Sequence, residues 1–390
     1  MSTMERLALI PRDGFFCKDG RGWHSSASER GHGVAWPWPS TVLGALRTMW
    51  GRSRETVSGQ PFGPREWRAQ TEQVRLESAI ALRRPTGTAW SESQRVWPAP
   101  LDGIWLEGRN DILSLQPQPP MLRTLGRTDD EAREAMWVAS PEAQGKPRPT
   151  RRWWSDEQFT NWLSGQAVEV NDRAIEMSRR VQTHVGIGPE TFTAEEGILF
   201  SHDVIETLEH EAEWALGVEV AFPAEWSSTV ATLGSDRRMA AVETLTPRIF
   251  DLPARVLEAF RSETRGLRLI VTTPACFTGG WLFEGFERRD LEFRGRLAAI
   301  DGELVLRAAM VARPADMSGW DMAANNGAGA PKPSTRMVPP GSVYFFERCD
   351  GRPFAEAEAR ALWLSAHGTR DGEGFGRVVP GVWNPMREVK

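Results

Sequence analysis

The feature that most constrains the fold of this chain is a regular alternation of apolar and polar side chains over residues 206–221. A period of two is typical of a strand that buries one face. A helix over the same stretch would instead bring His202, Glu206 and His210 onto one face as potential metal ligands. On a strand these residues spread over more than about 20 Å, at roughly 3.3 Å per residue. We therefore predict a half-buried strand at residues 206–221 and no metal site.

The rest of the chain mixes helices and strands. One helix is predicted to start at Ser40, where prolines give way to residues that can cap, and to end at Gly51. Another starts at Ser155, which opens a capping box of the Ser-x-x-Gln form, and ends at Gly165. The other expected helices lie at residues 251–264 and 354–366, and the expected strands lie at residues 6–10, 76–83, 104–107, 267–273, 343–346 and 378–379.

A hairpin is predicted where Asp301 and Gly302, a strong two-residue turn signal, join strands at 292–300 and 303–311. Residues 59–150 are rich in Pro and Gly and are expected to be irregular. Strands that pair through hairpins as well as across helices indicate an α+β fold. The expected loops lie at residues 116–120, 146–150 and 325–333.

The composition is that of a globular protein, with 40% hydrophobic and 25% charged residues. A length of 390 residues predicts two or three domains. No apolar run is long enough to cross a bilayer, and no secretory signal is recognised, so we expect a cytoplasmic protein without a membrane partner. The 3 cysteines lie far apart and the 6 histidines are scattered, so no disulfide framework, zinc site or other cofactor is expected.

The net charge of −5 is unfavourable for a nucleic-acid binder, because phosphate contacts need positive charge. Residues 190–225 carry Asp and Glu but no Lys or Arg, whereas the first fifty residues lean positive. Nearly all positive charges are Arg, whose planar fork suits phosphates and base edges, although genome composition explains this bias equally well. The 18 Trp residues offer stacking surfaces, but indoles more often pack in cores. The overall charge therefore decides nothing about function.

A glycine cluster at residues 372–376 lies between a predicted helix and a predicted strand, with Arg370 and Arg377 on either side. Glycines allow backbone N–H groups to face outward toward an anion. The cluster is not a nucleotide-binding P-loop, because no Gly-Lys-Ser/Thr follows and a strand comes next. A tight turn that requires positive φ explains the cluster as well as an anion site does.

Several ordered segments resemble the RAMP superfamily of CRISPR proteins, and specifically the third subunit of the type III-B (Cmr) effector complex. These segments span nearly the whole chain, and their joint order is more specific than any one of them. One departure is Ser235, where the family tends to have a second Gly, which puts the role of that loop in doubt. The segments are PRDGFFCKDGR at 11–21, PWPSTVLGALRT at 37–48, TPACF at 273–277, GW at 280–281, GWD at 319–321, VPPGSVYFF at 338–346 and GEGFG at 372–376.

This resemblance implies two ferredoxin-like (RRM-like, βαββαβ) domains with insertions. We assign residues 1–185 to an N-terminal domain with an irregular insertion, and residues 186–390 to a C-terminal domain that ends in the Gly-rich loop. The resemblance also implies a non-catalytic RNA-binding subunit that anchors the 5′ repeat-derived tag of the crRNA in antiviral defence. Its partners would be the large polymerase-like subunit and the first backbone subunit, with no small-molecule substrate.

The residues of these segments suit single-stranded RNA, which proteins hold through cationic side chains, backbone amides and aromatic platforms. The helix that starts at Ser40 presents free N–H groups to a phosphate, and Arg47 lies two turns further on. We expect this region and the Gly-rich loop at 372–376 to converge into a single cradle for RNA. Trp36 and Trp38 are expected to pack beneath this helix. The predicted RNA-binding residues are Arg12, Lys18, Arg21, His24, Ser40, Thr41, Arg47, Arg237, Arg238, Arg370, Gly372, Gly374, Phe375, Gly376 and Arg377.

Two other functions were weighed. A metal-independent RAMP endoribonuclease that processes CRISPR RNA would need a general base and a general acid, usually His, and no pair of histidines here is spaced as a dyad. A Trp-rich carbohydrate-binding protein would be secreted and is usually a repeat or all-β protein. Binding to RNA should weaken steeply with salt, whereas binding to sugar should not.

Overall fold

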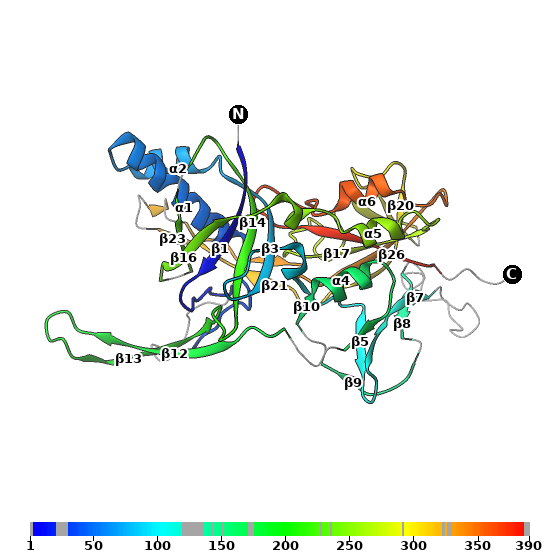
Figure 1. Ribbon diagram of the computed structural model, residues 1–390, viewed down its shortest axis with the longest axis horizontal. Helices are drawn as coiled ribbons and strands as arrows, with labels where there is room; N and C mark the ends of the chain where they lie inside the picture. Colours follow the sequence, from blue (N-terminus) through cyan, green and yellow to red (C-terminus); the bar gives the residue numbers. More distant parts are fainter. Residues whose placement is uncertain are drawn as a thin grey trace.

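The computed structural model describes residues 3–20, 30–118, 136–141, 143–149, 152–170, 175–226, 228–234, 236–290, 292–321, 324–325 and 329–385. Two large, mainly antiparallel sheets lie side by side along the long axis of the molecule (Figure 1). With its helices on and beside these sheets the chain has the predicted α+β fold. No helix in the described residues is long and apolar enough to cross a membrane.

The first sheet has seven strands in the order β10-β4-β3-β14-β1-β16-β15. β1 lies between β14 and β16 and is antiparallel to both, so that Leu7 pairs with Val218 and with Thr244. The strands are β1 (Thr3–Pro11), β3 (Arg75–Pro85), β4 (Arg95–Pro98), β10 (Trp153–Ser155), β14 (Ala212–Phe222), β15 (Val230–Leu233) and β16 (Arg238–Thr244).

The predicted alternating strand is confirmed as β14, but it starts at Ala212 and is buried on both faces. Leu216 and Val218 pack on one face with Val42 and Leu46 of helix α1 (Pro39–Ser58). Ala215 belongs to the other face, in a core shared with the second sheet. Because both faces are buried, the carboxylate of Glu213 is buried too, and its charge is neutralised by the guanidinium of Arg84 at 2.7 Å.

Helix α1 is longer than predicted. It continues through Gly51 to Ser58 and ends at Gly59, whose φ of 71° lets its N–H bond back to the carbonyl of Glu55. A Cβ at Gly51 would meet the indole of Trp67, so this glycine permits close packing of α1 on α2 (Pro64–Thr71) rather than ending the helix. The predicted end at Gly51 is therefore wrong.

The second sheet has six strands in the order β18-β19-β20-β25-β17-β26. Helices α4 (Asp156–Leu163), α5 (Ala254–Ala259) and α6 (Glu356–Leu362) lie beside it and share its core (Figure 1). The capping box at Ser155 is confirmed, since its Oγ accepts the N–H of Gln158 at 3.2 Å. The strands are β17 (Gly266–Val271), β18 (Phe286–Arg289), β19 (Glu292–Gly295), β20 (Leu304–Met310), β25 (Val343–Arg348) and β26 (Val378–Trp383).

Three predicted elements of this half are corrected. The hairpin partners β19 and β20 pair only up to Gly295 and Leu304, because Leu297 and Ile300 turn into the core instead of extending the strand. The helix predicted at 251–264 ends at Ala259, where the hydroxyls of Ser262 and Thr264 both donate to its carbonyl. The helix predicted at 354–366 is limited to α6.

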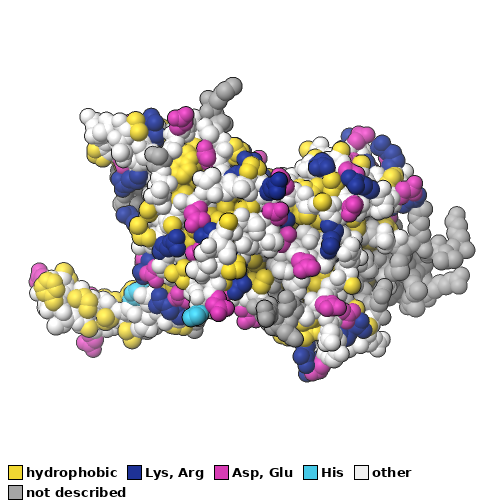
Figure 2. Space-filling view, in the orientation of Figure 1, with side chains coloured by type: hydrophobic (Ala, Val, Ile, Leu, Met, Phe, Trp, Pro, Cys, Tyr) yellow, Lys and Arg dark blue, Asp and Glu magenta, His cyan; other side chains and the backbone are white. Residues whose placement is uncertain are grey.

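A long hairpin of β12 (Arg179–Ile187) and β13 (Ala194–Ile205) projects from the body at the lower left of Figure 1. Apolar side chains lie exposed along it, with Phe192 82% exposed at its end, and Figure 2 shows them as a yellow band. We refer to this hairpin as the arm. Its base pairs with the short strand β2 (Arg30–Gly31).

The middle of the chain is more regular than predicted. The strand predicted at 76–83 is confirmed as β3, an inner strand of the first sheet, and the predicted loops at 116–120 and 146–150 contain short strands. The strand predicted at 104–107 is confirmed as one of the strands of the smaller sheets. These strands include β5 (Gly103–Leu106), β6 (Asp111–Ser114), β7 (Gln116–Gln118), β8 (Val138–Ser140), β9 (Pro147–Arg148) and β11 (Val168–Glu169). Two short strand pairs also form later in the chain, between β21 (Ala315–Met317) and β24 (Thr335–Met337), and between β22 (Trp320–Asp321) and β23 (Ala330–Pro331). Of these strands, β23 lies within the predicted loop at 325–333.

The predicted boundary between residues 185 and 186 falls inside β12, and β14, β15 and β16 return to the sheet that contains β1. The chain passes to the second sheet only after Thr244. The division into two domains stays a prediction.

Candidate nucleic-acid interface

A cavity of about 710 Å³ lies where the two halves of the chain meet. The first half contributes the run Trp36-Pro37-Trp38-Pro39 before α1, together with Trp153 at the start of β10. The second half contributes Thr273-Pro274 and Pro339-Pro340. Four of the segments that carry the sequence resemblance, at 11–21, 37–48, 273–277 and 338–346, thus contribute residues to the wall of one cavity. Such a volume is within the ~300–1,000 Å³ of ligand sites in general.

The beginning of α1 forms part of this wall. Trp38 and not Ser40 occupies the N-cap position, without a side-chain cap, and Pro39 takes the first helical position. The Ser40 hydroxyl lies 3.7 Å from the sulfur of Met317, and the Thr41 hydroxyl bonds the thiol of Cys17. Burial raises the pKa of that thiol to about 12, and the bond from Thr41 opposes the rise. Both predicted hydroxyls therefore contact protein groups in this structure.

The Gly-rich loop packs against the start of β3. The N–H of Leu76 donates to the carbonyl of Gly372 at 3.2 Å, and the guanidinium of Arg377 donates to the carbonyl of Leu76 at 3.4 Å. Arg377 also reaches the carboxylate of Glu77 at 3.5 Å. The start of β3, in the first half of the chain, and the loop before β26, in the second half, are therefore in direct contact.

The backbone N–H groups of this loop do not face outward as predicted. Gly372 donates to the Asp371 carboxylate at 2.7 Å, Gly374 to the Asp371 carbonyl at 3.2 Å, and Gly376 to the Pro274 carbonyl at 2.8 Å. Gly374 and Gly376 have φ of 83° and 68°, and a Cβ at Gly376 would overlap the carbonyl of His367. The tight turn, which the sequence left open as the alternative, accounts for these two glycines.

Arg370 and Arg377 differ in how far they reach the surface. Arg370 is partly exposed, bonds Glu373 at 3.1 Å, stacks over the buried ring of Phe375 at 4.6 Å and approaches the sulfur of Met317 at 3.7 Å. Arg377 is buried and its loss of hydration lowers the pKa of its guanidinium. This burial argues against the predicted contact between Arg377 and RNA.

Arg47 lies on α1 close to this loop. Its guanidinium donates to the carbonyl of Glu72 at 3.3 Å, and its Nε has no hydrogen-bond partner among the described residues. Burial lowers the pKa of Arg47, while the nearby carboxylates of Glu373 and Glu72 raise it. Glu72 lies just before β3, which bonds the Gly-rich loop through Leu76 and Gly372, so Arg47 lies close to this loop, as predicted.

The remaining predicted residues lie elsewhere. Arg12 contacts Glu213 at 3.3 Å, and Arg238 contacts Asp13 at 2.7 Å, both where β1 ends and β16 begins. Arg237 is exposed, with φ of 51°. Lys18 pairs through its backbone with Gly33, a cavity residue. The predicted Arg21 and His24 lie outside the described residues, as does Ser235.

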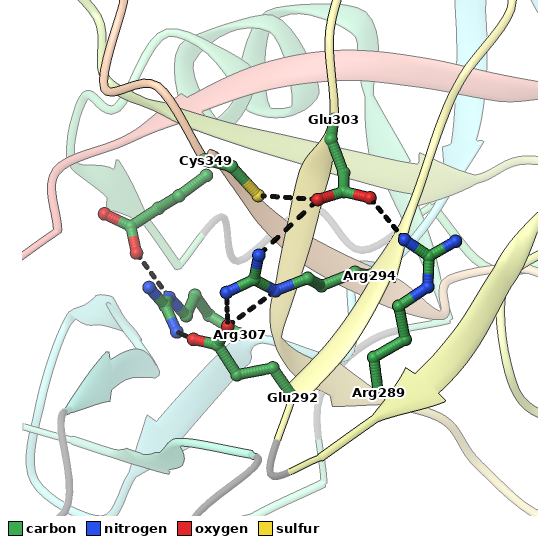
Figure 3. A network of polar contacts seen from close by, with 7 residues as sticks. Arg289, Glu292, Arg294, Glu303, Arg307 and Cys349 are labelled. Atoms are coloured by element: carbon green, nitrogen blue, oxygen red, sulfur yellow. Dashed lines mark hydrogen bonds and ion pairs between the residues drawn. The ribbon is translucent and has the colours of Figure 1, made fainter.

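Many arginines of the second half are neutralised by carboxylates. In Figure 3, Glu303 contacts Arg289 at 2.7 Å and the Cys349 sulfur at 3.7 Å, while Glu292 contacts Arg294 at 2.6 Å and Arg307 at 2.7 Å. On the face shown in Figure 2, basic and acidic side chains are likewise interspersed. The cluster of Figure 3 therefore offers little net positive charge to a phosphate.

Sequence reasoning missed two cavity residues, Arg152 and Arg179. Arg152 belongs to the run Arg151-Arg152-Trp153-Trp154, in which basic and aromatic residues adjoin. That pairing is a signal for nucleic-acid binding.

Comparison with known proteins defines the class. A family model of CRISPR-associated proteins matches residues 7–383, nearly the whole chain. The family is described as CRISPR-associated protein (Cas_Cmr3), and the chain belongs to it. The predicted resemblance to a RAMP-like subunit of the type III-B Cmr complex is thereby confirmed.

Two solved structures of type III-B Cmr-beta contain a chain similar to this one, each with a TM-score of 0.42. The chain in the complex bound to cognate target RNA and AMPPnP, state 1, is 10% identical, and the chain in the complex bound to cognate target RNA is 12% identical. Each comparison covers 87% of this chain and 86% of the other. No curated protein matches.

Proposed function

We propose that this chain is a non-catalytic RNA-binding subunit of the type III-B Cmr effector complex that anchors the 5′ repeat-derived tag of the crRNA. Family membership supports its place in the complex. The observation that carries the RNA-binding role is the cavity of about 710 Å³ between the two halves of the chain, because the first half lines it with both indoles and arginines. Aromatic rings and cationic side chains together are what a single strand of RNA requires.

Two ferredoxin-like halves are part of this proposal, and the strand orders support them. β14 separates β3 from β1 in the first sheet, and β25 separates β20 from β17 in the second. In each half the two flanking strands are antiparallel to the strand between them and so run parallel to each other, as in a split βαβ unit; in the second half β18 and β19 come between the two flanking strands in the sequence. Helix α1 supplies the crossover of the first half, and α6 precedes the last strand of the second half.

The partners in this proposal are the crRNA tag, the large polymerase-like subunit and the first backbone subunit. The arm is the most exposed apolar part of the described chain and supports contact with another subunit. The crRNA would occupy the cavity and leave the arm free for protein.

The surroundings of the histidines support a non-catalytic role. RNA cleavage by general acid–base catalysis needs two proton-transfer groups beside one phosphate. His202 is buried between the rings of Phe16 and His184, each 4.5 Å away between centroids. His367 is packed against Phe283, at 5.0 Å. None of the described histidines lines the cavity.

The test is a binding and cleavage assay with the assembled complex. A labelled crRNA with its 5′ tag should bind more tightly than the same RNA without the tag, and only when this chain is present. Equal binding of both RNAs would contradict the tag assignment. Incubation of the chain with precursor RNA should give no cleavage, and cleavage abolished by a single His→Gln substitution would instead support the endoribonuclease alternative.

A further inference from the structure

Arg152 and Arg179 reach the cavity from two different strands. Arg152 comes directly before β10, where its carbonyl accepts the N–H of Ala99 at 2.9 Å. Arg179 is the first residue of β12 and pairs with Ile205 of β13. A bridge between Trp153 and Ile175 joins the two segments. The backbone therefore holds both arginines at the wall of the same cavity.

Neither guanidinium forms an ion pair or a hydrogen bond with any residue that the structure describes, although the neighbouring arginines do. Arg148 contacts Glu107 at 3.2 Å, and Arg180 contacts both Glu206 and Asp13. Two carboxylates line the cavity, and both have other contacts: Asp316 lies 3.7 Å from Arg336, and Asp19 has a partner of its own.

The two arginines act on each other as like charges. Loss of hydration at the cavity wall lowers the pKa of Arg152, and the positive charge of Arg179 lowers it further. Both side chains nevertheless stay protonated, because an arginine does not lose its proton in proteins under ordinary conditions. Two positive charges held close together, with no counter-charge among the residues that the structure describes, are stabilised by any anion that enters between them.

We propose that Arg152 and Arg179 form an anion-binding pair that grips one phosphodiester group of an RNA strand in the cavity. This inference rests on the proposed function and names the residues that would carry out the binding. The planar guanidinium donates two parallel hydrogen bonds to phosphate oxygens, which an ammonium does not. The half-buried indole of Trp36, in the same wall, offers a neighbouring surface for a base.

The test uses the full chain and a labelled single-stranded RNA that contains the tag, with affinity measured over a series of KCl concentrations. The variant R152Q/R179Q should bind about tenfold more weakly or worse, and its salt slope should fall by about 0.7, the value for one phosphate contact on a single strand. The matched control is R148Q/R180Q, which removes the same charge from adjacent, paired arginines and should bind like the wild type.

Two further arms make the outcome decisive. R152K/R179K keeps both positive charges but lacks the planar guanidinium groups. Compared with R152Q/R179Q, it should restore the salt slope and only part of the affinity. Inorganic phosphate at constant ionic strength should raise the Tm of the wild type and not that of R152Q/R179Q. Unchanged RNA affinity and slope in R152Q/R179Q would overturn the pair and leave the proposed function standing. Failure of the wild-type chain to bind RNA, alone and in the complex, would overturn both.

Discussion

Ser40 and Arg370, which lie at opposite ends of the sequence, approach the same atom, the sulfur of Met317, each at 3.7 Å. Met317 packs in a small buried hydrophobic cluster with Trp38, Met337 and Phe375, so both contacts are made to a residue of the protein interior. The start of α1 and the Gly-rich loop are thereby fixed beside the cavity. This proximity is what the RNA-binding proposal requires, and it was predicted from the sequence.

Charge reversal at Arg47 tests the role of the contact region between α1 and the Gly-rich loop in RNA binding. R47E should weaken retention of the guide RNA by roughly tenfold, because it removes a positive charge near the Gly-rich loop and adds a negative one. The measurement is the amount of RNA that copurifies with the assembled complex. Arg68, which is 73% exposed on α2, provides the control R68E. Because R47E also places a carboxylate near Glu373, R47Q separates lost attraction from new repulsion. Wild-type retention in both Arg47 variants would remove Arg47 from the interface.

The glycines of the chain should respond differently to alanine. G376A should lower the free energy of unfolding by more than about 2 kcal/mol, since φ is 68° and the new Cβ would overlap the His367 carbonyl. G44A, in helix α1 with open space around it, should instead stabilise the chain by about 0.5–1 kcal/mol. Urea unfolding measures both. Equal effects at the two positions would show that the loop is not held in the described conformation.

Two buried tryptophans differ in hydrogen bonding. The indole N–H of Trp38 has no acceptor in the part of the chain that the structure describes, whereas that of Trp97 donates to Asp156 at 2.9 Å. Trp→Phe removes the same volume at both positions, so W97F should be less stable than W38F by about 1–2 kcal/mol. A larger loss in W38F, seen by urea unfolding, would mean that Trp38 has a partner in solution.

Stability should fall in mild acid because of His367. Burial and the charge of Arg377 lower the pKa of His367 from 6.5 to about 4. Since the unfolded chain binds the proton first, the contribution of His367 is fully present above pH 6.5 and is lost as the pH falls from 6.5 toward 4. The loss should be at most about 3 kcal/mol, at 1.36 kcal/mol per pKa unit. H367Q should flatten the pH dependence of unfolding in this window, and H32Q, at an exposed histidine, should not. Equal curves for wild type and H367Q would refute the assignment.

Local signals in the sequence predicted most of the individual elements. The capping box at Ser155, the strand that became β14 and the apolar strand at β25 all depend on short-range patterns. The failures have a tertiary cause. Gly51 looked like a helix end, but its role is set by Trp67 on another helix, and the turn at Gly302 was overridden by burial of Leu297 and Ile300.

The same reasoning explains what the sequence revealed of the site. The convergence of α1 and the Gly-rich loop was inferred from the family resemblance and not from spacing. The interpretation in which the amides of the loop face outward was wrong, because the carbonyls that accept their hydrogen bonds, such as that of Pro274, come from distant segments. Arg152 and Arg179 were missed because their lack of a counter-charge is visible only once the neighbours in space are known.

Crosslinking of the tag tests the central claim most directly. The complex would be assembled with a crRNA that carries 4-thiouridine at single positions of its 5′ tag, irradiated, and digested for mass spectrometry of the RNA-linked peptides. The account predicts crosslinks to the cavity wall, in residues 33–39 and 152–153, and to the adjoining Gly-rich loop at 370–377. Crosslinks confined to residues 181–204 of the arm or to the cluster of Figure 3, with none at the cavity or the loop, would contradict it.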